Sequence, residues 1–192
     1  MNNNKIYISI PKTGSNTVHK ILGNTKFNHI KAITIKNKLK NKYNLLDSFC
    51  FIRRPEDLVI SWYYYHKFNK NVIRKDVKDF YPSTIEEWVE KMKCKTHWEN
   101  QNHKNYNPDW DLSNPLFQKK WIIDHDNNII VKEIYPFDKF GEVLEKKFNC
   151  KVEHLNKTEK KDDVNNETIT KIRQIFKEDI EFYNNLLKQK YI

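Results

Sequence analysis

The chain has 192 residues, of which 38% are hydrophobic and 14% aromatic, and this apolar content argues against a disordered chain. Its length fits one domain over residues 1–192 with a substantial core. The formal net charge of +10 favours an anionic partner, and nucleic acid, anionic polysaccharide, a membrane surface and a phosphorylated cofactor all qualify.

The cysteines and the hydropathy pattern bear on where the protein works. Cys50, Cys94 and Cys150 are widely spaced and form no CxxC or Cys/His pattern. A sparse, odd set predicts reduced thiols and an intracellular setting rather than a disulfide framework. No run approaches the roughly 18 apolar residues of a membrane span, and no long apolar segment precedes the first predicted strand. We therefore expect a soluble, cytoplasmic protein.

Strand and helix patterns alternate along the first part of the chain. They predict a strand over 5–10, a turn over 11–15, a helix over 17–22 ending near Gly23, a helix over 33–43, a second strand over 48–52, and a helix from Pro55 through Tyr65. This order, in which a tight turn joins a strand to a helix, is the opening of many phosphate-binding α/β folds.

The second part of the chain continues the alternation. Ser83 and Glu86 form a capping-box pattern before a helix, and residues 94–114 are a polar, irregular candidate for a substrate-facing loop. Residues 129–131 predict a third strand and residues 137–148 a helix. An apolar stripe predicts one long final helix, through Ile169, Ile172, Phe176, Tyr183 and Leu187. Together these patterns predict an α/β fold with a central parallel sheet flanked by helices on both faces.

The turn at residues 11–17, Pro-Lys-Thr-Gly-Ser-Asn-Thr, is the first candidate site. A glycine-containing turn between a strand and a helix directs backbone N–H groups at one point, and the helix N-terminus adds partial positive charge. Lys12 adds a full charge, and Ser15 and Thr17 add hydroxyl donors. The segment therefore predicts an anion-binding loop, with an ordinary capped left-handed turn as the alternative. It lacks the GxxxxGK[ST] order of nucleoside triphosphatases and an evident Mg²⁺ aspartate.

A second candidate anion site follows the strand predicted over residues 48–52. Arg53 stands at the strand's carboxyl end, and Ser61 follows eight residues later, about two turns into the next helix. Both can reach one phosphate, because the guanidinium makes charge-assisted contacts. The alternative is a strand end followed by an amphipathic helix with one buried serine. Both motifs stand at carboxyl ends of predicted parallel strands, where α/β proteins bind anions.

Together the two motifs resemble the PAPS-dependent sulfotransferases, above all the carbohydrate- and heparan-type enzymes and their short microbial and viral relatives. Ile-Pro-Lys-Thr-Gly-Ser resembles the loop that cradles the phosphosulfate of 3′-phosphoadenosine-5′-phosphosulfate (PAPS). Residues 49–63 resemble the element that binds its 3′-phosphate. Shorter likenesses continue over most of the chain, at residues 27–30, 85–88, 118, 137–140 and 154–157. Two positions depart from the family pattern: Asn16, where a hydroxyl residue is usual, and Leu58, where an arginine is frequent.

The resemblance implies a three-layer, P-loop-like sulfotransferase fold and transfer of the sulfuryl group from PAPS to a hydroxyl acceptor, a carbohydrate. The product would be 3′-phosphoadenosine-5′-phosphate (PAP). The implied cofactor-binding residues are Lys12, Thr13, Gly14, Ser15, Asn16, Thr17, Arg53 and Ser61. Lys12 would stabilise the departing anion without a metal. We expect no metal site, since residues 124–126, Asp-His-Asp, read as a turn.

The acceptor hydroxyl needs a general base, and histidine has a suitable pKa. The candidate is His29, which lies between the two motifs, where heparan-type relatives place a catalytic histidine. The alternative is that His29 is an exposed turn histidine, and some relatives use a glutamate or an aspartate as the base. His66 and Glu99 are the next candidates. The acceptor groove could be lined by His97, Trp98, Glu99 and His103.

Two other functions compete with this interpretation. A nucleic-acid-binding module would also be basic and aromatic, but it would cluster its basic residues on one face, whereas the lysines here are scattered along the chain. A P-loop nucleotide kinase would need the Walker lysine pattern and Mg²⁺ ligands that the sequence lacks. We therefore expect no stable nucleic-acid partner and no membrane span.

Overall fold

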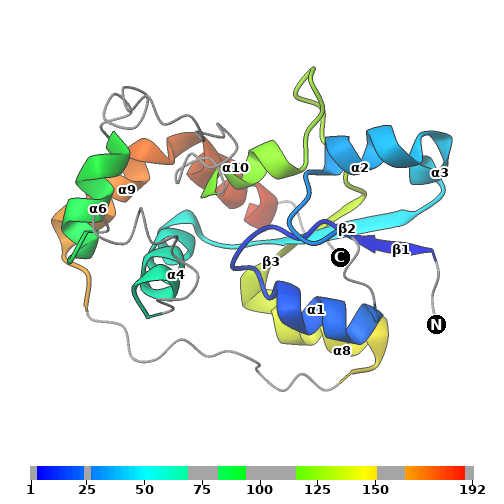
Figure 1. The fold of residues 1–192 in the computed structure, drawn as a ribbon, viewed down its shortest axis with the longest axis horizontal. Helices are drawn as coiled ribbons and strands as arrows, with labels where there is room; N and C mark the ends of the chain where they lie inside the picture. The colour runs from blue at the N-terminus through cyan, green and yellow to red at the C-terminus, as the bar shows by residue number, and fades with distance from the viewer. Residues whose placement is uncertain (1–3, 24–26, 69–81, 94–115, 151–162, 189–192) are drawn as a thin grey trace, which may run out of the picture.

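The computed structural model describes residues 4–23, 27–68, 82–93, 116–150 and 163–188 (Figure 1). In chain order its elements are β1 (Lys5–Tyr7), α1 (Ser15–Leu22), α2 (Ala32–Leu39), α3 (Asn41–Asn44), β2 (Asp47–Ile52), α4 (Pro55–Phe68), α6 (Ile85–Lys93), the 3₁₀ helix η3 (Gln118–Trp121), β3 (Glu133–Pro136), the 3₁₀ helix η4 (Phe137–Lys139), α8 (Phe140–Phe148), α9 (Asn166–Ile175) and α10 (Lys177–Lys188). None of the helices among these residues is long and apolar enough to cross a membrane.

The three described strands form one parallel sheet in the order β1-β2-β3. Tyr7 of β1 lies opposite Phe49 of β2, and Ile52 of β2 lies opposite Pro136 of β3. Helices α1 and α8 lie on one side of the sheet, and α2 and α3 lie on the other (Figure 1). The mixed α/β architecture, with a parallel sheet flanked by helices, is as the sequence predicts.

Alternate side chains of the strands fill two separate cores. Toward α1 and α8 the sheet presents mostly rings, and the cluster on this face comprises Tyr7, Val18, Phe49, Phe51, Tyr135, Phe140 and Leu144. Toward α2 and α10 it presents smaller residues, including Ile6, Ile8, Cys50, Ile52 and Ile134. Burial of each large apolar side chain stabilises the fold by roughly 1.5–3 kcal/mol. A further core joins α4, α6 and α9 beside the sheet.

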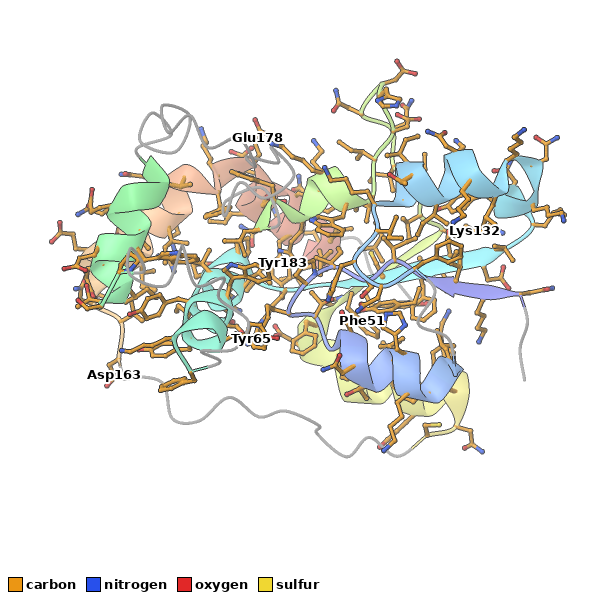
Figure 2. All side chains as sticks on the ribbon, in the orientation of Figure 1. Phe51, Tyr65, Lys132, Asp163, Glu178 and Tyr183 are labelled. Atoms are coloured by element: carbon orange, nitrogen blue, oxygen red, sulfur yellow. The ribbon has the colours of Figure 1, made fainter. Side chains whose placement is uncertain are left out.

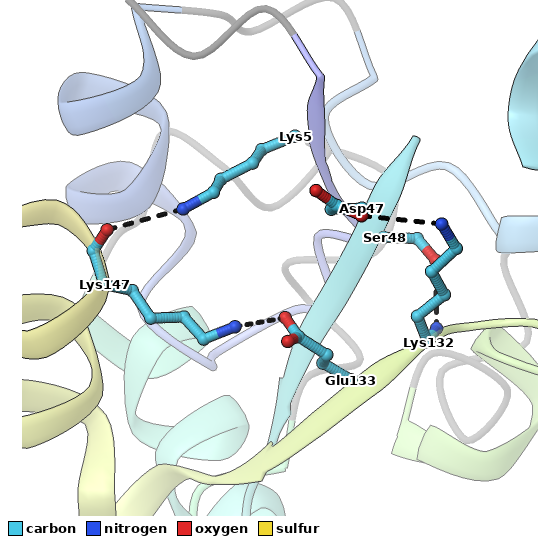
Figure 3. A network of polar contacts seen from close by, with 6 residues as sticks. All are labelled: Lys5, Asp47, Ser48, Lys132, Glu133 and Lys147. Atoms are coloured by element: carbon cyan, nitrogen blue, oxygen red, sulfur yellow. Dashed lines mark hydrogen bonds and ion pairs between the residues drawn. The ribbon is translucent and has the colours of Figure 1, made fainter. Parts of the chain in front are cut away.

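Polar contacts fasten the amino ends of the strands (Figure 3). Lys147 of α8 forms an ion pair with Glu133 of β3, and its carbonyl accepts a hydrogen bond of 3.4 Å from Lys5 Nζ at the start of β1. Lys132 pairs with Asp47 of β2 at 3.5 Å. Exposed pairs of this kind contribute about 0–1 kcal/mol each. They lie at the edge of the sheet opposite the loops that follow β1 and β2.

The third strand begins later than the sequence predicts. Residues 129–131 are not a strand of the sheet; β3 is formed by residues 133–136. Asp124 Oδ1 accepts hydrogen bonds from the N–H groups of Asp126 and Asn128, which folds this segment into a turn, as expected for residues 124–126. The turn brings Ile129 into an isolated antiparallel bridge with Ile123 and leaves it 46% exposed. The apolar run therefore pairs locally, before the chain enters the sheet.

Two predicted helices are each divided in the structure. The segment predicted over 33–43 breaks at Lys40, whose φ is +51°. The predicted final helix breaks at Phe176, so α9 packs against α4 and α6 while α10 also contacts β3 and η3. A single straight helix could not reach both groups of elements. The break also shifts the buried face of α10, where Leu186 is 5% exposed and the predicted Leu187 is 49% exposed.

The cap of α6 lies one residue later than predicted. Thr84 Oγ1 accepts a hydrogen bond of 3.2 Å from the Glu87 N–H, and the Glu87 carboxylate accepts one of 3.1 Å from the Ser83 N–H. Glu87, not Glu86, therefore occupies the box position, because Thr84 is the residue that stands at the N-cap.

Gly14 allows the β1–α1 turn to press against α8. Its φ is +82°, and an added Cβ would lie 2.5 Å from the Phe140 ring and 3.3 Å from the Phe137 ring. Phe140 is only 5% exposed, and its centroid lies 4.7 Å from that of Phe51. The ring therefore has little room to move away, and a residue without a side chain is required at this position.

We predict that Gly14→Ala lowers the free energy of unfolding by more than about 2 kcal/mol. Left-handed strain accounts for about 1 kcal/mol and overpacking against Phe140 for roughly 1–3 kcal/mol. Gly23→Ala is the matched control, because Gly23 also has a positive φ, +63°, but has no atom within 4 Å of the added Cβ. Chemical denaturation of both variants measures the difference. Equal losses at the two glycines would contradict the packing argument.

Candidate functional site

The turn after β1 has the backbone form of an anion nest. Lys12 has φ +62° and Gly14 has φ +82°, while Thr13 between them has no positive φ. Alternation of this kind aims successive N–H groups at one point. Helix α1 begins directly afterwards, at Ser15, and its first N–H groups have no partner within the helix. The predicted loop residues therefore lie together, at a strand-to-helix junction.

Buried hydroxyl groups stabilise the backbone of this turn. Thr13 Oγ1 donates to the Ile10 carbonyl at 2.7 Å, and Ser15 Oγ donates to the same oxygen at 3.2 Å. The Tyr7 hydroxyl donates to the Thr13 carbonyl at 3.2 Å, and burial raises the pKa of Tyr7, which keeps it a neutral donor. Thr13 is fully buried, and its hydroxyl group supports the turn from the protein interior. Asn16 is exposed, and Thr17 is buried in the first turn of α1.

Lys12 links this turn to α4. Its ammonium group lies 3.8 Å from the centroid of the Tyr65 ring, in a cation–π contact (Tyr65 is labelled in Figure 2). Ser61 stands four residues before Tyr65 and therefore shares its side of the helix. Ser61 is 2% exposed. The lysine of the first motif therefore contacts the helix that carries the serine of the second motif, and that serine is buried, as the alternative interpretation of this segment predicts.

Arg53 joins the two motifs directly. It follows the last residue of β2, and its Nη1 donates to the Lys12 carbonyl at 3.4 Å. Its guanidinium carbon lies 5.1 Å from the centroid of Phe137. Burial lowers the pKa of Arg53, while Asp57 and Asp138 oppose that shift. The half-buried guanidinium is therefore a strong donor toward an anion. Leu58, which replaces a frequent family arginine, is 1% exposed in the core between α4, α6 and α9.

His29 contacts the segment that follows β1. Its Nδ1 is 3.0 Å from the Ser9 carbonyl, which can only accept, so Nδ1 carries the hydrogen and Nε2 of the neutral ring holds the lone pair. The residue has a φ of +53° and remains exposed at the surface. Partial burial of its ring lowers the pKa of His29, and the charges of His19 and Lys12 lower it further, against the opposing effect of the Ser9 hydrogen bond. The ring is thus prepared to accept a proton at Nε2 near neutral pH.

Asn28 fastens the segment that carries His29. The Ser9 hydroxyl donates to Asn28 Oδ1 at 3.0 Å, and His19 Nε2 lies 3.2 Å from the same oxygen. Because an amide oxygen only accepts, His19 donates here from Nε2. His19 is 7% exposed and packs edge-on against Tyr7. These contacts tie His29 to β1 and α1, the two elements that also carry the anion nest.

Ser9, Tyr65 and Gln118 contact the candidate residues His29, Lys12 and Arg53, although no local sequence pattern gives them a role. Asn28 contacts Ser9 and His19 instead. Gln118 and Asn28 lie within the shorter family likenesses. The side chain of His66 and residues 94–115, with His97, Trp98, Glu99 and His103, lie outside the described residues, as do residues 154–157. Within the described ranges, no group of three or more His, Cys, Asp or Glu residues could hold a metal ion.

Comparisons with known proteins found no relative of this chain. No protein-family model matches it, and no curated protein or solved structure matches it either. The functional interpretation therefore depends on the residues of the site and their geometry.

We predict that NMR of ¹⁵N-labelled protein will show His29 as the Nδ1–H tautomer, with a pKa below the ordinary value of about 6.5. Because the folded pKa lies below the unfolded one, the neutral ring contributes stability that is present above the unfolded pKa and is lost as the pH falls through the folded pKa. A His29→Gln variant assigns the signal. An Nε2–H tautomer, or a pKa above the ordinary value, would show that the Ser9 contact and the surrounding charges do not act on this ring.

Proposed function

We propose that this chain is a sulfotransferase that moves the sulfuryl group of PAPS to a hydroxyl acceptor, a carbohydrate, and that its layers form a small P-loop-like sulfotransferase fold. The observation that carries this proposal is the hydrogen bond from the Arg53 guanidinium to the Lys12 carbonyl, which joins two anion-binding motifs at one edge of a parallel sheet. PAPS carries two anionic groups, at opposite sides of its ribose, and therefore needs two such motifs side by side.

The proposed assignment gives the turn at residues 12–17 to the 5′-phosphosulfate. Its alternating backbone and the N-terminus of α1 supply N–H donors, and Lys12 supplies a mobile charge. Arg53 and Ser61 are assigned to the 3′-phosphate. The ammonium group would exchange its Tyr65 contact for the phosphosulfate, because an ion pair with a nearby anion is stronger than a cation–π contact.

In the proposed reaction the acceptor oxygen attacks sulfur from the side opposite the bridging oxygen. A new S–O bond forms, the bond from sulfur to the bridging oxygen breaks, and PAP departs with that electron pair. Lys12 and the N–H groups of the turn stabilise the developing negative charge. His29 Nε2 takes the proton of the acceptor hydroxyl, and the Ser9 carbonyl holds the ring in the required tautomer.

We predict that PAP raises the melting temperature more than AMP does, because only PAP has the 3′-phosphate that Arg53 is proposed to bind. Arg53→Ala should weaken PAP binding by about 10–100-fold, the scale of a hydrogen bond to a charged group, and leave AMP binding nearly unchanged. Arg54→Ala is the matched control, since Arg54 is the exposed neighbour. Isothermal titration calorimetry measures all six affinities, those of three proteins for two nucleotides.

Equal affinities of the parent protein for PAP and AMP would argue against the second motif. Binding of DNA or RNA with a steep salt dependence, together with no preference for PAP, would instead favour the nucleic-acid-binding alternative.

We predict that His29→Ala binds PAP as tightly as the parent but lowers kcat by about 10²–10⁴, because a general base acts only in the transition state. Parent kcat should be constant above pH 7 and fall as the pH drops through the lowered pKa of His29, since imidazolium accepts no proton. His125→Ala is the control, an exposed histidine in the turn before β3. Sulfuryl transfer from ³⁵S-labelled PAPS to a carbohydrate panel gives the rates. Retention of most activity would assign His29 a structural role and move the search to His66 and Glu99.

A further inference from the structure

A buried amide group holds the backbone of Arg53 at both of its polar groups. The Arg53 N–H donates to Gln118 Oε1 at 2.7 Å, and Gln118 Nε2 donates to the Arg53 carbonyl at 2.6 Å. Gln118 is 2% exposed and stands at the start of η3, 65 residues away in the sequence. Because the amide forms a two-point contact, it sets the orientation of the peptide groups on either side of Arg53, and hence the direction in which the guanidinium leaves the sheet.

A buried carboxylate in turn holds η3. Asp179 Oδ1, in the first turn of α10, accepts a hydrogen bond of 2.9 Å from the Lys119 N–H, and the Gln118 N–H faces the same carboxylate. Asp179 is 2% exposed. A negative charge at the N-terminal N–H groups of a helical turn is favourable, so the carboxylate fixes η3 where Gln118 begins it. A chain of contacts therefore runs from Asp179 through Gln118 to Arg53, and from Arg53 Nη1 to the carbonyl of Lys12.

We propose that Gln118 and Asp179 are positioning residues for the 3′-phosphate site, and that proton uptake by Asp179 loosens the hold of η3 on Arg53. This inference rests on the proposed function, because it takes Arg53 as the residue that binds the 3′-phosphate. Neither residue touches the nucleotide in this assignment. Both act through the backbone of Arg53. The affinity for the 3′-phosphate therefore becomes sensitive to the Asp179 carboxyl group, which accepts a hydrogen bond from the Lys119 N–H of η3.

The surroundings of Asp179 support its titration in the neutral range. Burial raises its pKa to about 6, and Glu178 on its own helix adds to that rise. On η3, the N–H groups and the charge of Lys120 oppose the rise. Helix α10 also packs against α4, α9 and β3. Because the folded pKa exceeds the unfolded one, stability is complete below the unfolded pKa and is lost as the pH rises through about 6. Protonation therefore stabilises the fold as a whole by removing a buried charge, and the loosening is local, because it weakens only the contacts of the carboxylate with the N–H groups of η3. Asp179→Asn should therefore melt no lower than the parent at pH 8.

The first test measures the affinities for PAP and AMP by calorimetry at pH 7.5. Because the two nucleotides differ in the 3′-phosphate, the ratio of their affinities isolates the contribution of that group to binding. Gln118→Met has a side chain of similar length and removes both hydrogen bonds to Arg53, and Gln118→Glu keeps the acceptor but loses the donor. We expect each to lower the ratio about tenfold, the scale of a lost buried hydrogen bond. Gln174→Ala, at an exposed glutamine of α9, is the matched control and should leave the ratio unchanged.

The second test follows the same ratio from pH 7.5 to pH 5 in the parent, in Asp179→Asn and in the control Glu181→Gln on the exposed side of α10. Protonation of the 3′-phosphate weakens the binding of PAP to all three proteins alike, since phosphate monoesters have a pKa near 6. We expect an additional loss of roughly two- to fivefold in the parent and in Glu181→Gln that is missing in Asp179→Asn. Amide hydrogen exchange without nucleotide should show that protection of the Lys119 N–H decreases as the pH falls in the parent and in Glu181→Gln, but not in Asp179→Asn.

The outcomes separate this inference from the proposed function. A parent protein that does not prefer PAP to AMP would overturn both. A parent that prefers PAP, with a ratio that survives Gln118→Met and Gln118→Glu, would leave the sulfotransferase proposal standing and overturn the positioning role. If both Gln118 variants unfold, the pH dependence of the affinity ratio in Asp179→Asn becomes the measurement that tests the positioning role. Identical pH dependence of the ratio and of Lys119 exchange in Asp179→Asn and the parent would overturn the role of the carboxylate.

Discussion

Parallel pairing of β1 with β2 is the constraint on which the candidate site depends. With Tyr7 opposite Phe49, the two strands run in the same direction and end at the same edge of the sheet. Lys12 and Arg53, 41 residues apart in the chain, therefore meet, and one hydrogen bond joins them. The ring-filled core beneath, with Phe51 against Phe140, holds this edge against α8. Gly14 then becomes obligatory, since any Cβ there would enter the Phe140 ring.

The charges of the site follow from the same arrangement. Lys12, Arg53 and His29 lie at the carboxyl ends of β1 and β2, while the ion pairs of Lys132 with Asp47 and of Lys147 with Glu133 lie at the amino ends. Lys12 contacts the Tyr65 ring, and Arg53 contacts the Phe137 ring within reach of the charges of Asp57 and Asp138. An aromatic face attracts a cation without cancelling its charge. The two cationic side chains at one edge of the sheet are the electrostatic basis of the sulfotransferase proposal.

The parts of the fold that the sequence predicts well are those specified by local chemistry. Gly23 ends α1 with a φ of +63°, and Pro55 begins α4, because each residue acts through its own backbone. The errors arise where a local turn or a distant contact overrides the pattern. Residues 129–131 have strand composition, yet a turn capped by Asp124 folds them back onto residues 122 and 123. The final apolar stripe continues through Phe176, but its two halves serve different cores, so the helix breaks there.

The sequence by itself determined the two strand-to-helix motifs. A turn glycine with a lysine, or an arginine at a strand end, can be recognised from a few neighbouring residues. The resemblance to heparan-type enzymes also singled out His29, from its place between the two motifs. Only the tertiary structure decided which groups surround these residues. The Ser9 carbonyl sets the tautomer of His29, the Tyr65 ring contacts Lys12, and the Gln118 amide forms hydrogen bonds with the backbone of Arg53. Such partners come from 20 or more residues away, and no local pattern encodes them. A glutamine or a serine becomes informative only when folding brings it within hydrogen-bond distance of a group that needs a partner.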